Sequence, residues 1–162
     1  MKRFFLFFVV LMGLLLFVSA DAPVRYGLKP GRVAPAIVCG DSTLSVASSV
    51  PQQYTLLHFW ASYDAPSRIA NIQYDRVVEQ CNSNRLRYIA VSYEHNERLY
   101  AEILKRDSVV PHTQYYDKAG SKSSTFARYR LKEGFATYLI DANGTIVDCN
   151  PTPQSIEKLL GK

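Results

Sequence analysis

The stretch that decides the fold reads Tyr54-Thr55-Leu56-Leu57-His58-Phe59-Trp60-Ala61-Ser62-Tyr63-Asp64-Ala65-Pro66-Ser67. Residues 54–61 are a nearly continuous apolar run with β-branched and aromatic members, which predicts a central strand covered on both faces. Residues 62–64 break this run, and a helical pattern follows. Its apolar positions are Ala70, Tyr74, Val77, Val78 and Cys81. We therefore expect a buried strand that runs into a helix at residues 64–67.

Strand and helix patterns alternate on either side of this junction. Residues 33–39 are short and apolar, and Pro35 within them favours an edge position in the sheet. Residues 86–93 predict a second strand, and Asn96 is a suitable N-cap for the helix that follows. The first half of the chain thus predicts two strands, each followed by a helix.

The second half of the chain begins with a less regular section that contains a short helix at residues 123–129. Residues 136–140 and 145–149 predict two strands, and the Asp-Ala-Asn-Gly sequence between them is a strong hairpin signal. Thr152 followed by Pro153 is a good N-cap with proline at the first helical position, which predicts a final helix.

This order of elements predicts one domain of the α/β class. A βαβ crossover followed by an antiparallel ββα unit gives a mixed sheet with helices on both faces. No internal repeat or low-complexity tract interrupts the pattern.

The N-terminus has the three parts of a secretory signal peptide. Residues 1–3 are short and basic, residues 4–18 are apolar apart from Gly13, and residues 18–20 offer small side chains for cleavage. We expect a signal peptide at residues 1–20 and an exported domain, periplasmic or secreted, at residues 21–162. The alternative is a retained membrane anchor, because the apolar run is close to the length that spans a bilayer.

Composition excludes several classes of function. The formal net charge is +5, and it falls to about +3 without Lys2 and Arg3 of the signal peptide. No basic run is interleaved with aromatic residues, so we expect no nucleic-acid partner. No Cys/His cluster has the spacing of metal ligands, and we expect neither a metal nor a cofactor.

The three cysteines, Cys39, Cys81 and Cys149, would lie in an oxidising compartment. Because their number is odd, at least one is free or paired with another molecule. None belongs to a Cys-x-x-Cys motif. Cys81 falls on the apolar helix face and is expected to be a buried, inert thiol. Cys39 and Cys149 fall on outer strands and could pair, or either could be exposed and reactive, so every pairing stays open.

The order of elements, with several of its strings, resembles the thioredoxin fold, and more narrowly the exported TlpA/ResA-like thiol–disulfide oxidoreductases. The similar strings are Val33-Ala34-Pro35, Leu57-His58-Phe59-Trp60-Ala61-Ser62-Tyr63, Ala90-Val91-Ser92 and Tyr138-Leu139-Ile140-Asp141-Ala142-Asn143-Gly144. The resemblance extends from about residue 31 to residue 160, nearly the whole mature chain.

The sequence departs from that family at its active site. The resemblance implies a Cys-x-Pro-Cys type of motif where this chain has Asp64-Ala65-Pro66-Ser67, so the proline and the following Arg68 remain while both thiols are missing. The family's cis-proline would fall at Phe135, or at Ala136 with a shift of one residue. A cis peptide bond outside proline costs about 2.5–4 kcal/mol, so we expect a trans bond there.

The chemistry at residues 64–67 follows from these replacements. Thiol–disulfide exchange requires one thiolate that attacks and a second sulfur that resolves. Asp64 instead offers a carboxylate that can cap the helix, which is also the simplest structural role for it. Ser67 keeps the size of a cysteine but has only a hydroxyl, and no nucleophile-elbow motif surrounds it.

Three other polar residues lie near this junction. His58 is expected to be a satisfied histidine of the core strand. Glu94 and His95 follow the second strand, at the edge where open α/β sheets bind ligands, but a solvated loop pair is the simpler interpretation.

Two hypotheses of function remain. In the first, the chain is a redox-inactive binding or accessory protein whose former active-site face holds a protein or peptide. The candidate binding residues are Asp64, Pro66, Ser67, Arg68 and Phe135. In the second, the chain is a thiol–disulfide oxidoreductase or other thiol-reactive enzyme that uses Cys39, Cys81 or Cys149. The first is preferred because no cysteine lies at an expected helix N-terminus. A membrane partner is expected only if the N-terminal segment is retained.

Overall fold

A computed structural model describes residues 25–40, 42–81 and 84–161. The signal peptide expected at residues 1–20 lies outside these residues. The strands are β1 Ile37–Cys39, β2 Ser42–Leu44, β3 Tyr54–Trp60, β4 Leu86–Ser92, β5 Gln114–Tyr116, β6 Thr137–Ile140 and β7 Ile146–Cys149. The α-helices are α2 Ala65–Cys81, α3 Glu97–Asp107, α4 Ser124–Arg128 and α5 Pro153–Leu160, with short 3-10 helices at η2 Pro111–Thr113 and η3 Gly120–Lys122.

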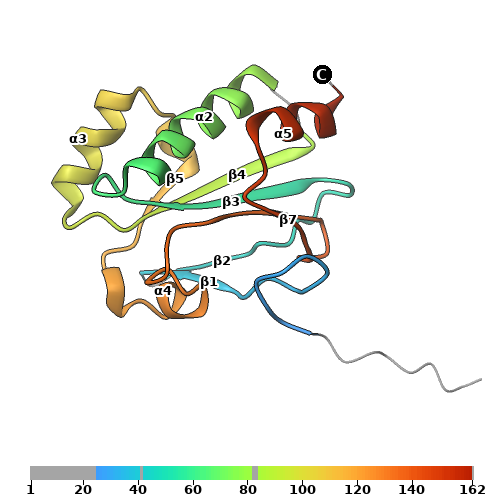
Figure 1. Ribbon diagram of the computed structural model, residues 1–162, viewed down its shortest axis with the longest axis horizontal. Coiled ribbons are helices and arrows are strands. Elements are labelled where there is room, and N and C mark those ends of the chain that lie inside the picture. The colour runs from blue at the N-terminus through green and yellow to red at the C-terminus, as the bar shows by residue number, and fades with distance from the viewer. Residues whose placement is uncertain (1–24, 41, 82–83, 162) are drawn as a thin grey trace, which may run out of the picture.

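The main sheet has five strands in the order β5-β4-β3-β6-β7. Strand β3 lies at its centre, parallel to β4 and antiparallel to β6 (Figure 1). The outer strands β5 and β7 pair in parallel with β4 and antiparallel with β6, respectively. The sheet is therefore mixed, as the sequence predicts.

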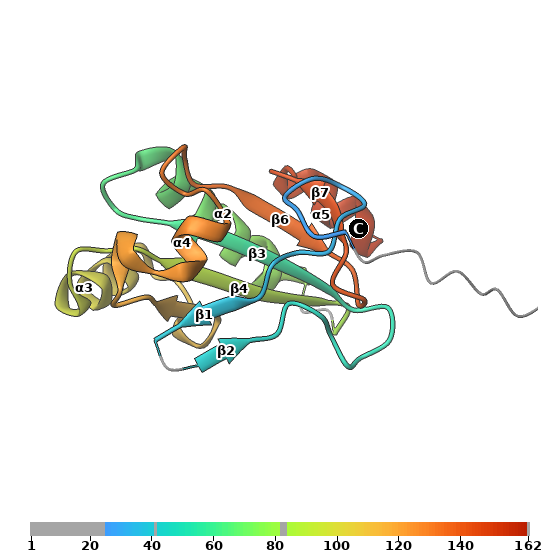
Figure 2. The ribbon, with the colours of Figure 1, turned by 90° about the horizontal axis from the view of Figure 1, so that it is seen from below.

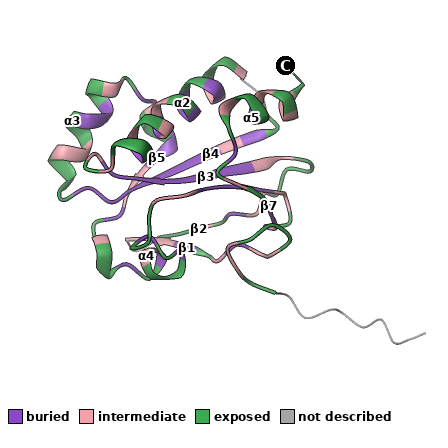
Figure 3. Cartoon of the chain, viewed as in Figure 1, coloured by how far each residue is buried: buried purple, intermediate pink, exposed green. Residues whose placement is uncertain are grey.

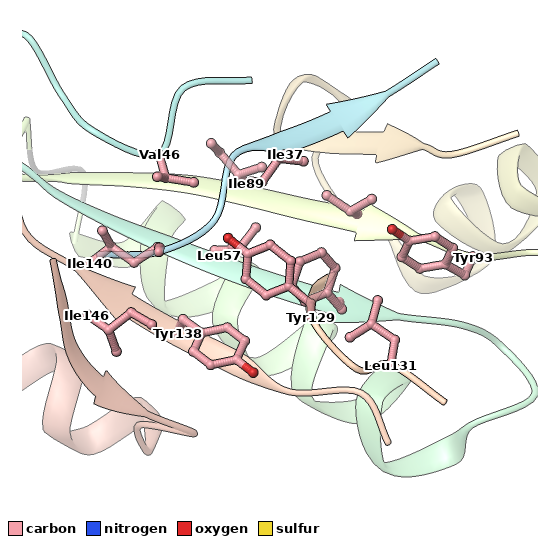
Figure 4. Close-up of a cluster of buried hydrophobic side chains, with 13 residues drawn as sticks. Ile37, Val46, Leu57, Ile89, Tyr93, Tyr129, Leu131, Tyr138, Ile140 and Ile146 are labelled. Atoms are coloured by element: carbon pink, nitrogen blue, oxygen red, sulfur yellow. The ribbon is translucent and has the colours of Figure 1, made fainter. Parts of the chain in front are cut away.

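Two apolar layers cover this sheet, and β3 contributes alternate residues to each. Leu56 and Trp60 pack on the side of α2, α3 and α5, whereas Leu57 and Phe59 pack on the side of α4 and β1. Figure 1 shows α2, α3 and α5 above the sheet, and α4 with the β1–β2 pair below it. Figure 2, seen from below, shows α4 and the β1–β2 pair in front of the sheet. Figure 3 shows β3 as almost wholly buried, and Figure 4 shows the lower core around Leu57 and Ile89. Burial on both faces explains the continuous apolar run at residues 54–61.

The expected helix caps and hairpin are confirmed. The Asn96 side chain accepts a hydrogen bond from the backbone N–H of Leu99 at 2.8 Å, and that of Thr152 accepts one from Ser155 at 3.1 Å. In the hairpin, the Asp141 carboxylate accepts from the backbone N–H groups of Asn143 and Thr145. These local bonds fix where α3, α5 and the β6–β7 turn begin.

The structure differs from the sequence prediction at β1, β2 and β5, and β2 Ser42–Leu44 was not among the predicted strands. Residues 33–39 do not form an edge strand of the main sheet. Val33 forms isolated bridges to Tyr26 and Thr145, and β1 pairs with β2 in a separate two-stranded sheet. Strand β5 was not expected. It has three residues, Gln114–Tyr116, and it is held by parallel pairing with β4 rather than by an apolar pattern of its own.

Candidate functional site

The start of α2 carries the two residues that stand in the cysteine positions of the resemblance. The Asp64 carboxylate accepts a hydrogen bond from the backbone N–H of Ser67 at 2.9 Å, which caps the helix. The Ser67 hydroxyl donates to the Asp64 carbonyl at 3.0 Å and accepts from the backbone N–H of Ala61 at 3.3 Å. Ser67 is buried, and its hydroxyl both donates and accepts a hydrogen bond within the protein. This pair offers no attacking group.

His58 reaches the same turn from below but does not activate Ser67. Its Nε2 lies 2.9 Å from the Ser67 carbonyl, to which it donates, and its Nδ1 lies 2.8 Å from the Thr137 hydroxyl, from which it accepts. Burial lowers the pKa of His58 from 6.5 to about 4, although the bond to Ser67 and the charge of Asp64 act in the opposite direction. His58 is thus the satisfied core histidine that the sequence predicts. Because it contacts the carbonyl and not the hydroxyl of Ser67, the geometry is not that of a serine hydrolase.

Glu94 is the residue whose role the sequence reasoning missed. It was expected in a solvated loop, but only 3% of its surface is exposed. Its carboxylate accepts a short hydrogen bond from the backbone N–H of Ser62 and a second bond from the Ser62 hydroxyl at 2.9 Å. Glu94 therefore holds the β3–α2 loop in place from the end of β4. The position after β4 was the available signal, and the burial of the side chain was not visible in the sequence.

Aromatic side chains surround the same loop. Tyr63, just before Asp64, stacks on His95 with ring centroids 5.0 Å apart and lies 6.2 Å from the Phe135 ring. Phe135 also stacks on Tyr93 at 6.1 Å. Burial, aided by the nearby carboxylates of Glu94 and Asp64, raises the pKa of Tyr63. Phe135 thus lies beside the α2 start, as its place in the resemblance implies.

The other two candidate binding residues have different surroundings. Pro66 is exposed in the first turn of α2. Arg68 forms a bidentate ion pair with Asp107 at the end of α3, with distances of 2.7 Å and 2.5 Å, and the side chain of Asp107 is only 7% exposed. The Arg68 guanidinium is therefore already bound within the protein and ties α2 to α3. No peptide bond between the described residues is cis, including those at Phe135 and Ala136.

The three cysteines are unpaired and half-buried, each in its own surroundings. The Cys39 thiol donates to the Tyr116 carbonyl at 3.3 Å, and the Cys149 thiol donates to the Leu28 carbonyl at 3.6 Å. Cys81 packs against the core beneath the long helices, although it is less buried than the sequence predicts. Burial and the charge of Asp117 raise the pKa of Cys39 to about 11, and burial and the charge of Asp148 raise that of Cys149.

The described part of the chain has no group of three or more His, Cys, Asp or Glu residues that could hold a metal ion. Within residues 25–40, 42–81 and 84–161, no helix is long and apolar enough to cross a membrane.

Comparisons with known proteins place the chain in a family. No protein-family model matches it, and no curated protein does. Among solved structures, a thioredoxin-like protein from Parabacteroides distasonis is 31% identical with a TM-score of 0.78, over 85% of this chain and 98% of that one.

Two other solved structures share the fold at lower identity. The thioredoxin domain of a thiol–disulfide oxidoreductase from Bacteroides vulgatus is 18% identical, with a TM-score of 0.66 over 83% of this chain and 100% of that one. A thiol:disulfide interchange protein from Bacteroides sp. is 20% identical, with a TM-score of 0.68 over 83% of this chain and 92% of that one. The fold, together with the identity and coverage of the Parabacteroides protein, shows that this chain belongs to the thioredoxin-like proteins, as a member that has no cysteine pair.

Proposed function

We propose that this chain is an exported, redox-inactive binding or accessory protein that holds a protein or peptide partner at the face around the start of α2. The observation that carries the proposal is that the Asp64 carboxylate and the Ser67 hydroxyl form their hydrogen bonds within the protein. Without a sulfur at either position, the site can neither attack a disulfide nor resolve a mixed disulfide. Export rests on the signal-peptide pattern of the first twenty residues.

The side chains around this face are suited to contact with a partner. Tyr63 is 57% exposed and Ile69 is 55% exposed, although both are large and apolar. His95 and Pro66 are exposed beside them, and Glu94 holds the loop that carries Tyr63. Exposed aromatic residues on a fixed loop are typical of recognition surfaces, because little conformational freedom is lost on binding.

The thiol environments do not favour the alternative, an enzyme that uses Cys39, Cys81 or Cys149. Exchange proceeds through the thiolate, and burial raises the pKa of Cys39 to about 11 and also raises that of Cys149. Cys81 is the last residue of α2, at the opposite end of the helix from the N-terminus that can activate a thiol.

Redox activity is tested by insulin-disulfide reduction with the purified protein and with the Cys39→Ser, Cys81→Ser and Cys149→Ser variants. We expect no turnover above the rate of the added reductant alone in any of the four proteins. Turnover that disappears in one variant would identify the thiol responsible and overturn the proposal.

The binding face is tested by placing a photo-cross-linkable phenylalanine at Tyr63 and, as a control, at Val147, which is 45% exposed on β7. In the exported fraction, we expect cross-linked products from position 63 that are weakened by Asp64→Asn and absent from position 147. Equal products from the two positions would show that the face around α2 is not the binding surface.

A further inference from the structure

A second surface lies on the other side of the sheet from the long helices. It is an open groove of about 1250 Å³. Three segments line it: residues 25–36 of the N-terminal part, residues 128–130 at the end of α4, and residues 133–138 that lead into β6. We call it the α4 groove. It meets the face around the start of α2 only at Phe135.

The charge of the α4 groove is strongly one-sided. Its basic lining residues are Arg25, Lys29, Arg32, Arg128 and Arg130, and its single acidic lining residue is Glu133. No ion pair holds any of these five cations within the described part of the chain, where the pairs are Arg68–Asp107 and Arg98–Glu102. All five belong to the mature domain, whose net charge is only about +3. The excess of positive over negative charge in the domain therefore lies at this groove, and the rest of the mature chain is close to neutral.

The floor of the groove is formed by packed aromatic side chains. Tyr129 is 2% exposed and donates its hydroxyl to the Pro35 carbonyl at 2.6 Å. Its ring packs on that of Tyr138 with centroids 5.5 Å apart, and Figure 4 shows both rings beside the core. The partly buried Phe135 continues the floor toward the start of α2. A ligand in the groove would therefore contact apolar surface below and cations at the rim.

The size and chemistry of the groove favour one class of ligand. Sites for small molecules usually enclose about 300–1,000 Å³, so this open groove is larger than one small anion would fill. Guanidinium groups can form bidentate hydrogen bonds with carboxylates, and four of the five cations are arginines. We propose that the α4 groove binds an extended acidic segment of a partner polypeptide, with carboxylates at the arginine rim and apolar side chains toward Tyr129, Tyr138 and Phe135. The bare polyanion of a sulfated sugar would leave the apolar floor unused.

This inference does not depend on the function proposed for the face around α2. The two surfaces contain different charged residues, so each can be changed without the other. Asp64→Asn is expected to leave binding in the α4 groove unchanged.

The test measures binding of a short, dye-labelled peptide with alternating glutamate and tyrosine by fluorescence anisotropy. The groove variant is Lys29→Glu/Arg130→Glu, in which both residues are exposed and neither side chain bonds another described residue. The control variant is Arg76→Glu/Arg106→Glu, which makes the same change of net charge at exposed positions on α2 and α3, across the sheet. Circular dichroism verifies that each variant is folded.

We expect the groove variant to bind about tenfold or more weakly, the control variant to bind within about twofold of the unchanged protein, and added salt to weaken binding. A peptide with glutamine in place of glutamate should lose most of the affinity. Equal losses in the two variants would mean that net charge alone attracts the peptide, and would overturn the proposal. Stronger binding to dextran sulfate, or to vesicles of phosphatidylglycerol, than to the peptide would also overturn it.

Discussion

At the scale of single residues, Asp64 has a structural role that its position alone explains. Helix N-termini stabilise negative charge through free N–H groups and the helix dipole, and the Asp64 carboxylate uses this at 2.9 Å from the Ser67 nitrogen. In the thiol–disulfide oxidoreductases that the sequence resembles, the same electrostatics would favour a thiolate. The replacement keeps the negative charge at this point and removes the sulfur chemistry.

Asp64→Ala removes the cap, and we expect it to lower the free energy of unfolding by about 1 kcal/mol. Asp64→Asn keeps an accepting oxygen and should lose clearly less. Urea unfolding of the three proteins measures both differences. If Asn and Ala cost the same, the hydrogen bond to Ser67 is not what Asp64 contributes.

His58 makes the stability depend on pH. The folded protein keeps the imidazole neutral, with a pKa of about 4, whereas the unfolded chain binds the proton with a pKa near 6.5. As the pH falls from about 6.5 to about 4, protonation increasingly favours the unfolded chain, and the free energy of unfolding should fall by up to about 3 kcal/mol. Above pH 6.5 this contribution is constant.

The matched variant for this prediction is His58→Gln, because glutamine is neutral and can both donate and accept. Urea unfolding at a series of pH values should show a flatter slope between about pH 4 and 6.5 in the variant than in the unchanged protein. Identical slopes would show that another group titrates in this range.

At the scale of elements, a buried network of hydrogen bonds links α2 to the sheet. The Asn71 side chain of α2 accepts from the Tyr88 hydroxyl of β4 at 2.7 Å and exchanges bonds of 3.3 Å with the Gln114 amide of β5. Gln114 also accepts from the Trp60 indole of β3 at 3.1 Å. One helix and three strands thus share one set of directional bonds, which fixes where α2 begins relative to the end of β3.

Asn71→Ala leaves the Tyr88 hydroxyl and the Gln114 amide without this partner in the core. We expect the free energy of unfolding to fall by about 2 kcal/mol or more. Gln73→Ala, at an exposed position two residues along the same helix, is the control and should change it by less than about 0.5 kcal/mol. Thermal or urea unfolding measures the difference, and equal effects of the two substitutions would mean that the network does not stabilise α2.

Most elements could be predicted from the sequence because their signals are local. The apolar run of β3, the helical spacing of α2 and the cap at Asn96 are each carried by neighbouring residues. Strand β5 could not be predicted, since its residues Gln114–Tyr116 pair with a strand more than twenty positions away and carry no pattern of their own. Register with a distant strand is a property of the folded chain.

The residues of the candidate site differ in the same way, because some of their roles follow from neighbouring residues and others depend on distant ones. Asp64 as a helix cap and His58 as a core histidine follow from the chain around them. The burial of Glu94 does not, because its partner Ser62 comes from another loop, thirty-two positions away. The α4 groove was missed for the same reason. Its cations come from segments about a hundred positions apart, such as Lys29 and Arg130, and no basic run marks them.

At the scale of the whole molecule, the thioredoxin-like scaffold is intact around a site that has lost its thiols. The five-stranded sheet, the helix after β3 and the place of Phe135 beside the helix start are all present. The central claim is that the backbone at positions 64 and 67 keeps the geometry of a Cys-x-x-Cys site, although the peptide bonds at Phe135 and Ala136 are trans.

The most direct test is the disulfide reductase activity of Asp64→Cys/Ser67→Cys, measured with insulin beside the unchanged protein. We predict that the two new cysteines form a disulfide, that the thiol at position 64 is the more reactive because it lies at the start of α2, and that only the double variant reduces insulin. A folded double variant whose thiols do not pair, or an unchanged protein that already reduces insulin, would contradict this claim.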